Sequence, residues 1–222
     1  MTSYQLDFAK HSTTSDIPKL QIIWDCIPLQ LGRENKRFLF SVLRKSARAR
    51  EYEGAIQWLC DAGLIYKSYQ ITTAKYPLKG YIDRNAFKIF LLDVGLLGAM
   101  ANIPAEIIVE GNRLFDEYKG GFVENYVAQQ LKTLKQIDLF YWKSSGKKAE
   151  VDFLCEFDNL ICPLEVKSGI NPKSKSLRSF DLQFNPQALS RTTLLNLKHD
   201  GKTCNYPLYS ISLFPELFKH NL

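Results

Sequence analysis

Two short apolar runs that carry acidic residues near their outer ends constrain the fold most. Residues 149–157 and 160–167 have the composition of β-strands, and only Asp158 and Asn159 separate them. A two-residue connection makes a hairpin and fixes its register, with Asp152 opposite Glu165 and Glu150 opposite Lys167. Since side chains alternate between the two faces of a strand, we expect Glu150, Asp152, Glu165 and Lys167 on one face.

Two carboxylates directly opposite each other destabilise a sheet unless a cation lies between them. Mg²⁺ or Mn²⁺ prefers oxygen ligands, so Asp152, Glu165 and the main-chain carbonyl of Val166 are the predicted metal ligands. Lys167 would lie in the same pocket, where it could orient an attacking water or neutralise the charge of a phosphorane. The alternative is an ordinary solvated sheet face on which Glu150 and Lys167 form a cross-strand ion pair.

The residues around this hairpin predict an αβββαβ order. Apolar spacing predicts a helix over 121–134, which carries Glu124, and a strand over 137–142. A helix over 174–184 and a strand over 192–197 follow the hairpin, and residues 206–218 predict a short strand and a helical turn interrupted by Pro215. We expect Glu124 to complete or support the metal shell; alternatively it is a surface residue of its helix.

The N-terminal half has the element order of a winged helix. Helices are predicted over 34–45 and 51–62, Gly63 then ends the second helix, and residues 64–72 predict a strand. The chain therefore reads as an α/β protein with two domains, a winged-helix-like domain over 1–100 and an αβββαβ domain over 101–222.

Basic residues gather in one stretch of the N-terminal half. Between residues 33 and 50 the only acid is Glu34, and the whole chain has a formal net charge of +6. The basic residues of this stretch are Arg33, Lys36, Arg37, Arg44, Lys45, Arg48 and Arg50. They predict sequence-independent contacts with nucleic-acid phosphates, and the alternative is a solvated helical face.

The remaining composition argues against several other classes of protein. The five cysteines are widely spaced, form no CxxC pair and accompany only three histidines, which indicates reduced core residues rather than a zinc site. The sequence has no apolar run of about 20 residues, which a membrane span needs, and its first residues are not apolar enough for a signal peptide. We expect a cytoplasmic protein.

These motifs resemble those of the PD-(D/E)XK nuclease superfamily, whose shared core is also αβββαβ, and the resemblance implies a restriction-endonuclease-like, nuclease-like domain over 101–222. The match is closer to the uncharacterised C-terminal domain that follows AAA-type ATPase modules in many bacterial and archaeal proteins. The similar phrases are FVEN at 122–125, AEVDF at 149–153 and PLEVKSG at 163–169, with ARAREY at 47–52, WLCDAGL at 58–64 and LDVGLL at 92–97 upstream. The resemblance implies Glu124, Asp152, Glu165 and Lys167 as the catalytic set, Mg²⁺ or Mn²⁺ as cofactor, and DNA rather than RNA as partner.

One feature of that family is missing from this sequence. No GxxxxGK[ST] phosphate-binding loop occurs, so the chain cannot hydrolyse ATP by that route. We expect it to be the C-terminal part of a longer AAA-type ATPase. Two functions stay open at this point, a Mg²⁺-dependent phosphodiesterase acting on nucleic acid and an inactive module that binds nucleic acid or a partner.

Overall fold

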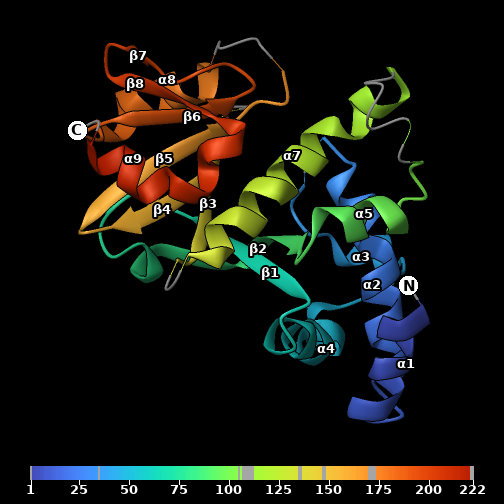
Figure 1. The fold of residues 1–222 in the computed structure, drawn as a ribbon. Coiled ribbons are helices and arrows are strands. Elements are labelled where there is room, and N and C mark those ends of the chain that lie inside the picture. The colour runs from blue at the N-terminus through green and yellow to red at the C-terminus, as the bar shows by residue number, and fades with distance from the viewer. Residues whose placement is uncertain are drawn as a thin grey trace. The chain divides into compact units, whose positions relative to one another are not determined.

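A computed structural model describes residues 2–34, 36–104, 106, 113–134, 137–146, 149–169 and 174–220. Over these residues the chain is a mixed α/β protein with an eight-stranded sheet in the order β2-β1-β3-β4-β5-β6-β8-β7 (Figure 1). The strands are β1 (Ile65–Ile71), β2 (Ile82–Leu91), β3 (Leu139–Lys143), β4 (Glu150–Phe157), β5 (Leu160–Val166), β6 (Leu189–Thr193), β7 (Lys198–Asp200) and β8 (Thr203–Pro207). Antiparallel and parallel pairings both occur, since β4 pairs antiparallel with β3 and β5, whereas β5 and β6 run parallel.

Contacts divide the chain into two compact units that interleave along the sequence. One unit contains Met1–Lys67 and Ile89–Phe122, and the other contains Ser68–Lys88 and Val123–Leu222. The two domains expected from the sequence, 1–100 and 101–222, are each one continuous stretch, whereas each compact unit combines two stretches. The domain boundary at residue 100 stays a prediction. The strands β1 and β2 each begin in one unit and end in the other.

The first unit is mainly helical. Its helices are α1 (Thr2–His11), α2 (Ile17–Leu31), α3 (Phe40–Leu43), α4 (Ala49–Asp61), α5 (Val94–Met100) and the first half of α7 (Arg113–Thr133). The predicted helix over 51–62 is confirmed by α4, and Gly63 follows it with a φ of 71°, a conformation that glycine adopts without strain.

A close approach of two main chains explains Gly121 in this unit. A Cβ atom at this position would lie 2.6 Å from the carbonyl oxygen of Leu31 at the end of α2. Real Cβ atoms do not approach backbone so closely, so only glycine lets α7 pass the end of α2 at this distance. At the preceding residue, Gly120, the nearest atom to a Cβ would be the Lys36 Nζ at 3.8 Å, an ordinary contact.

The predicted helix over 34–45 is wrong, because among the residues of this range that the structure describes only Phe40–Leu43 is helical. The side-chain amide of Gln30 donates to the Leu39 carbonyl at 3.0 Å and accepts from the Leu39 N–H at 3.2 Å. These two bonds engage the main chain of Leu39, which is extended. Arg44 is extended as well, so the helical segment between them has a single turn.

The second unit packs helices on both faces of the C-terminal strands. On one face, α8 (Lys175–Phe184) places Phe180 against Trp142 of β3, with ring centroids 5.3 Å apart. On the other, α9 (Phe214–His220) places Phe214 against Phe157 of β4, at 5.9 Å (Figure 1). Leu154 of β4 packs in the core with the apolar residues of α8, so α8 and α9 contact opposite faces of β4.

Most elements predicted for this unit are confirmed, with shifts at their ends. The predicted helices over 121–134 and 174–184 correspond to α7 and α8, and the predicted hairpin strands correspond to β4 and β5. The predicted strand over 192–197 is displaced, since β6 ends at Thr193. Pro215 does not interrupt a helix, because it lies in the first turn of α9, where proline is tolerated. A 3-10 helix, Leu208–Leu213, precedes α9.

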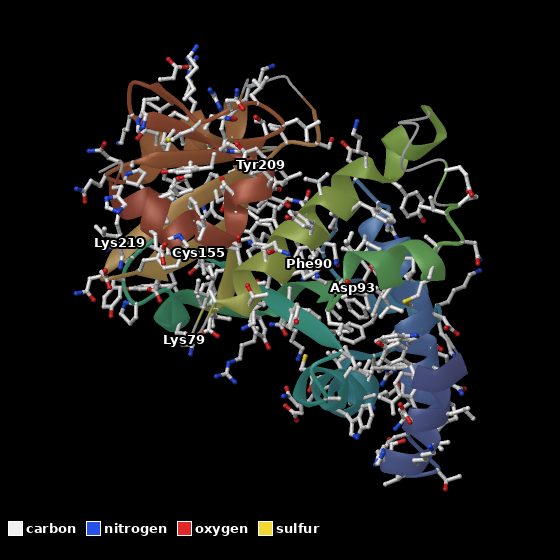
Figure 2. All side chains as sticks on the ribbon, in the orientation of Figure 1. Lys79, Phe90, Asp93, Cys155, Tyr209 and Lys219 are labelled. Carbon is white, nitrogen blue, oxygen red and sulfur yellow. The ribbon has the colours of Figure 1, made fainter. Side chains whose placement is uncertain are left out.

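The cysteines are free, as expected from their spacing. Cys26, Cys155, Cys162 and Cys204 are buried, and Cys60 is partly buried. Figure 2 labels Cys155, which lies on β4. It also labels Lys219 of α9, which forms an ion pair with Asp158 of the hairpin loop. Among the described residues, no helix has both the length and the apolar character that a membrane crossing requires.

Candidate metal and phosphate site

The β4–β5 hairpin has the predicted register and positions the site. Asp158 and Asn159 both have left-handed φ values, 48° and 66°, as a two-residue type I′ turn requires. The paired residues run from Phe157 opposite Leu160 to Phe153 opposite Leu164. Beyond that pair the ladder changes, because the Val166 N–H donates to the Asp152 Oδ2 at 2.8 Å instead of to a main-chain carbonyl.

An extra residue in β4 lies at the same place. Phe140 of β3 pairs with Leu154, but Trp142, two residues further, pairs with Val151, so Asp152 and Phe153 together lie opposite Tyr141. Such a bulge interrupts the strict alternation of side chains and changes the direction of the residues next to it. The extra residue lies beyond Val151, and Glu150 and Asp152 are both within electrostatic reach of Lys88, in keeping with the expected common face.

Glu150 forms ion pairs with two lysines from other strands. Its Oε1 lies 2.6 Å from the Lys88 Nζ of β2, and its Oε2 lies 3.5 Å from the Lys143 Nζ of β3. Burial would raise the pKa of Glu150, but Lys88 and Lys143 hold that pKa below its ordinary value. The alternative cross-strand pair with Lys167 is not what the structure shows.

Lys88 is a buried cation among carboxylates, and the sequence reading missed it. Its side chain is 1% exposed, and its Nζ lies 3.6 Å from the Glu124 Oε2 of α7 and 4.9 Å from the centre of the Tyr141 ring. Burial alone would lower the pKa of Lys88, but Glu124 and Glu150 raise it above its ordinary value, so the amine stays charged. The available signal was a single lysine inside the apolar run 86–91, because such a residue is buried only with an acidic partner.

Glu165 and Lys167 lie together at the end of β5. The Lys167 Nζ is 2.5 Å from the Glu165 Oε1, and the lysine is one-third exposed whereas the glutamate is 5% exposed. The second carboxylate oxygen of Glu165, Oε2, is buried and has no hydrogen-bond partner among the described residues. Burial raises the pKa of Glu165, and Lys167 offsets part of that increase. An unmatched buried carboxylate oxygen is costly, and a cation would remove that cost.

Asp152 is within electrostatic reach both of the group around Lys88 and of the Glu165–Lys167 pair. Burial raises its pKa to about 8, with Glu124 and Glu165 adding to the increase and Lys88 and the Val166 N–H opposing it. Three of the predicted carboxylates thus lie within electrostatic reach of one another, and Lys167 joins them through Glu165. We call this group the carboxylate centre; its members are Lys88, Glu124, Glu150, Asp152, Glu165 and Lys167.

The third predicted ligand, the carbonyl of Val166, is directed towards Asp152. In an extended strand the N–H and C=O of one residue leave on the same side, and the Val166 N–H already points at the Asp152 carboxylate. The N–H of the next residue, Lys167, points the other way and donates to the Thr192 carbonyl of β6. The local oxygens therefore suit a hard divalent cation.

The described part of the chain does not contain a ready-made ligand cluster. No group of three or more His, Cys, Asp or Glu side chains within the described ranges converges closely enough to hold a metal ion. Two carboxylates and a main-chain carbonyl, with water, are a usual arrangement for Mg²⁺, which keeps several of its waters. The residues present fit such an ion at the Asp152–Glu165 end of the centre, while Lys88 balances the charge at the Glu150 end.

The predicted nucleic-acid-binding residues are not on one helix. Arg33, Lys36 and Arg37 follow α2, Arg44 and Lys45 follow α3, and Arg48 and Arg50 lie at the start of α4. Five of the seven are exposed, and Lys36 and Arg37 are partly buried. These residues lie on three successive segments of the first unit, so they do not share one helical face.

Comparison with known families divides the chain in two. Residues 1–107 match the model of a domain of unknown function, DUF8612, and residues 119–211 match that of another, DUF4143. Neither the curated proteins nor the solved structures contain a match. The second model covers Glu124, Asp152, Glu165 and Lys167, whereas Lys88 lies in the segment that the first model covers.

Proposed function

We propose that the carboxylate centre binds Mg²⁺ or Mn²⁺ and hydrolyses phosphodiester bonds in nucleic acid, with DNA the preferred substrate. The proposal places a restriction-endonuclease-like core in the second half of the chain and a winged helix in the first, within a longer AAA-type ATPase. The observation that carries it is the buried Oε2 of Glu165, which has no hydrogen-bond partner in the described part of the chain, beside an Asp152 whose pKa is raised. Both features are expected of a site whose cation is part of its charge balance.

The proposed ligands are Asp152, Glu165 and the Val166 carbonyl. A bound divalent cation would supply a water of lowered pKa and polarise a phosphoryl oxygen. The Val166 N–H holds the Asp152 carboxylate in place through its 2.8 Å bond. Lys167 is one-third exposed and already directed at Glu165, so its ammonium can reach an entering phosphate and stabilise the charge that develops on it. Glu124 holds the Lys88 ammonium and supports the charge balance.

A second function follows from the position of Lys88. Its ammonium lies between Glu124 and Glu150 and contributes a permanent positive charge to the centre. A centre neutralised by lysines needs no metal to fold, so the domain could bind nucleic acid or a partner without hydrolysis. Turnover distinguishes the two functions, whereas metal binding alone does not.

The experiment measures both metal binding and cleavage. Purified chain is incubated with linear, circular and single-stranded DNA and RNA in Mg²⁺ or Mn²⁺, beside Asp152→Asn, Lys167→Ala and the control Asp138→Asn. Asp138 is a half-exposed residue that pairs with Lys79 away from the centre, so its substitution removes a carboxylate charge without touching the site. Metal affinity is measured separately by calorimetry.

The hydrolytic proposal expects cleavage that needs metal, is lost in Asp152→Asn and Lys167→Ala, and is kept in Asp138→Asn. It also expects Asp152→Asn to weaken metal binding at least tenfold. Absence of cleavage on every substrate, with normal metal binding in the wild type, would contradict hydrolysis and favour the binding module.

A further inference from the structure

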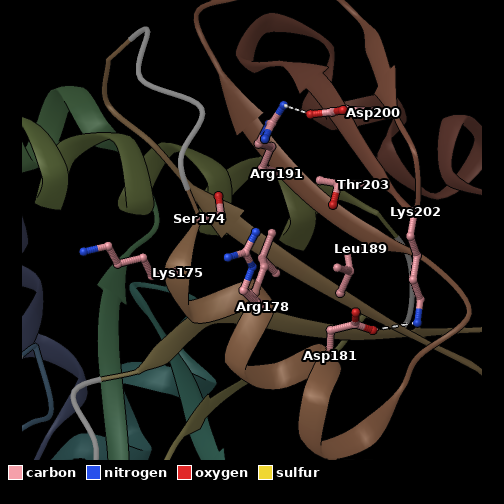
Figure 3. A pocket seen from close by; sticks show the side chains of 10 residues that line it. Ser174, Lys175, Arg178, Asp181, Leu189, Arg191, Asp200, Lys202 and Thr203 are labelled. Atoms are coloured by element: carbon pink, nitrogen blue, oxygen red, sulfur yellow. Dashed lines mark hydrogen bonds and ion pairs between the residues drawn. The ribbon is translucent and has the colours of Figure 1, made fainter.

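A cavity of about 660 Å³ lies where α8 meets β6 and β8, in the same unit as the carboxylate centre (Figure 3). Four of its lining side chains are cationic, namely Lys175, Arg178, Arg191 and Lys202, and two are acidic. Its volume is within the range of about 300 to 1,000 Å³ that is usual for sites that enclose small molecules. The cavity therefore carries a net positive charge.

The two acids of the cavity are engaged at its rim. Lys202 lies 2.6 Å from Asp181 of α8 and 2.7 Å from the side-chain oxygen of Asn185, and these contacts fasten the β7–β8 turn to the helix. Asp200 lies 3.8 Å from Arg191 and is mostly exposed, so solvent screens this pair. The acids thus reduce but do not cancel the positive charge.

Arg178 is the cation best placed to meet a ligand. It is exposed on α8, and Figure 3 shows it reaching from the helix into the space that Arg191 of β6 also borders, whereas Lys175 extends away. Below these charges the cavity is lined by the buried apolar side chains of Leu177 and Leu189. A cationic opening over an apolar floor suits a ligand with a phosphate and a flat apolar part.

The cavity adjoins the carboxylate centre through neighbouring strands. Arg191 of β6 is the residue paired with Glu165 of β5 in the parallel register. Adjacent strands are about 4.8 Å apart, and paired residues project on the same face of a sheet. A ligand held at Arg191 would therefore lie one strand away from Glu165.

We propose that this cavity holds one nucleotide of a nucleic-acid strand, with its phosphate between Arg178 and Arg191 and its sugar or base over the two leucines. The inference deepens the proposed function, on which it rests, by naming a single strand as the form in which substrate reaches the centre. A base-paired duplex is far larger than the cavity and cannot enter it. Arginine is the side chain best suited to hold a phosphate through paired N–H groups.

The test measures binding without cleavage. A fluorescent single-stranded oligonucleotide is titrated with the full chain in EDTA over a series of salt concentrations, for the wild type, Arg178→Gln and the matched control Arg84→Gln. Arg84 is an exposed arginine of β2 outside the cavity. Loss of one phosphate contact lowers the slope of log affinity against log salt by about 0.7 for single strands.

We expect that decrease, with at least threefold weaker binding in moderate salt, for Arg178→Gln and no change for Arg84→Gln. Unchanged binding by Arg178→Gln, or an equal loss in both variants, would overturn the proposal. Competition by a nucleoside monophosphate identifies the source of the phosphate. Displacement at micromolar nucleotide would indicate a free nucleotide as the ligand and overturn the single-strand inference, and displacement only at millimolar nucleotide supports the strand.

The binding test of the cavity and the cleavage test of the carboxylate centre can fail separately. If Arg178 controls binding but Mg²⁺ gives no cleavage, the nucleotide cavity stands and the hydrolytic function fails. If cleavage depends on Asp152 but binding is indifferent to Arg178, the hydrolytic function stands and the cavity is not where the strand lies.

Discussion

Replacing Lys88 with methionine should destabilise the metal-free protein more than any other single change in the carboxylate centre. Methionine has nearly the length of lysine but no charge, so it leaves the buried Glu124 without the Lys88 ammonium and leaves Glu150, which is 24% exposed, with Lys143. Removing one partner of a buried ion pair costs about 3–5 kcal/mol, because the remaining charge stays desolvated. A loss of that size is a large part of the stability of an ordinary domain.

Lys143 provides a matched control for Lys88. It contacts the same carboxylate, Glu150, at 3.5 Å, but its side chain is 36% exposed. Solvent screens such a pair, so Lys143→Met should cost no more than about 1 kcal/mol. The two variants differ in burial and not in the chemical change that they make.

The assay is urea denaturation of each variant in EDTA, followed by tryptophan fluorescence, and then in excess Mg²⁺. The double variant Lys88→Met/Glu150→Gln should recover part of the loss, because the unmatched carboxylate is removed as well. Mg²⁺ should stabilise Lys88→Met more than the wild type; a ligand at one hundred times its dissociation constant stabilises the protein that binds it by about 2.7 kcal/mol in total. Equal losses for Lys88→Met and Lys143→Met would refute the assignment of Lys88 as the internal cation.

Three further predictions address the fold and the site. Gly121→Ala should lower the free energy of unfolding, measured by denaturation, by about 1–3 kcal/mol, because its Cβ would clash with backbone. Gly120→Ala should raise the free energy of unfolding slightly, because its Cβ would meet no backbone atom. Equal effects of the two substitutions would contradict the close approach of α7 and α2. The raised pKa of Asp152 means that its neutral form stabilises the fold, a contribution present below about pH 4 and lost as pH rises to about 8. In EDTA the wild type should therefore lose stability across that window relative to Asp152→Asn, and identical pH profiles would exclude the shift. Gln30→Ala should cost about 1–3 kcal/mol and expose the amide of Leu39 to hydrogen exchange, and unchanged protection would argue against that pair.

The hairpin register could be predicted because it depends on local rules. A two-residue loop with both residues in the left-handed region, together with the two-residue period of a strand, fixes which residues pair. The order of helices and strands in the second half of the chain followed from apolar spacing in the same way. These features need no knowledge of distant segments.

The errors arose where distant segments decide the local structure. Gln30 engages the main chain of Leu39, a contact that no pattern within 34–45 reveals. The extra residue at Asp152 and Phe153 depends on pairing with β3, and Lys88, the ion-pair partner of Glu150, is more than sixty positions away in the sequence. Alternation along β4 alone could not show either the bulge or the lysine.

The interleaving of the two units limits how this chain can be divided or inherited. Lys88 lies before the segment that the DUF4143 model covers, and yet it holds Glu124 and Glu150 inside that segment. β1 also adds to the sheet as the parallel neighbour of β3. A C-terminal fragment that starts near residue 100 would lose the edge strand β2, its neighbour β1 and the internal cation. The two halves can therefore be exchanged between proteins only if the incoming N-terminal half brings an equivalent lysine on an equivalent strand.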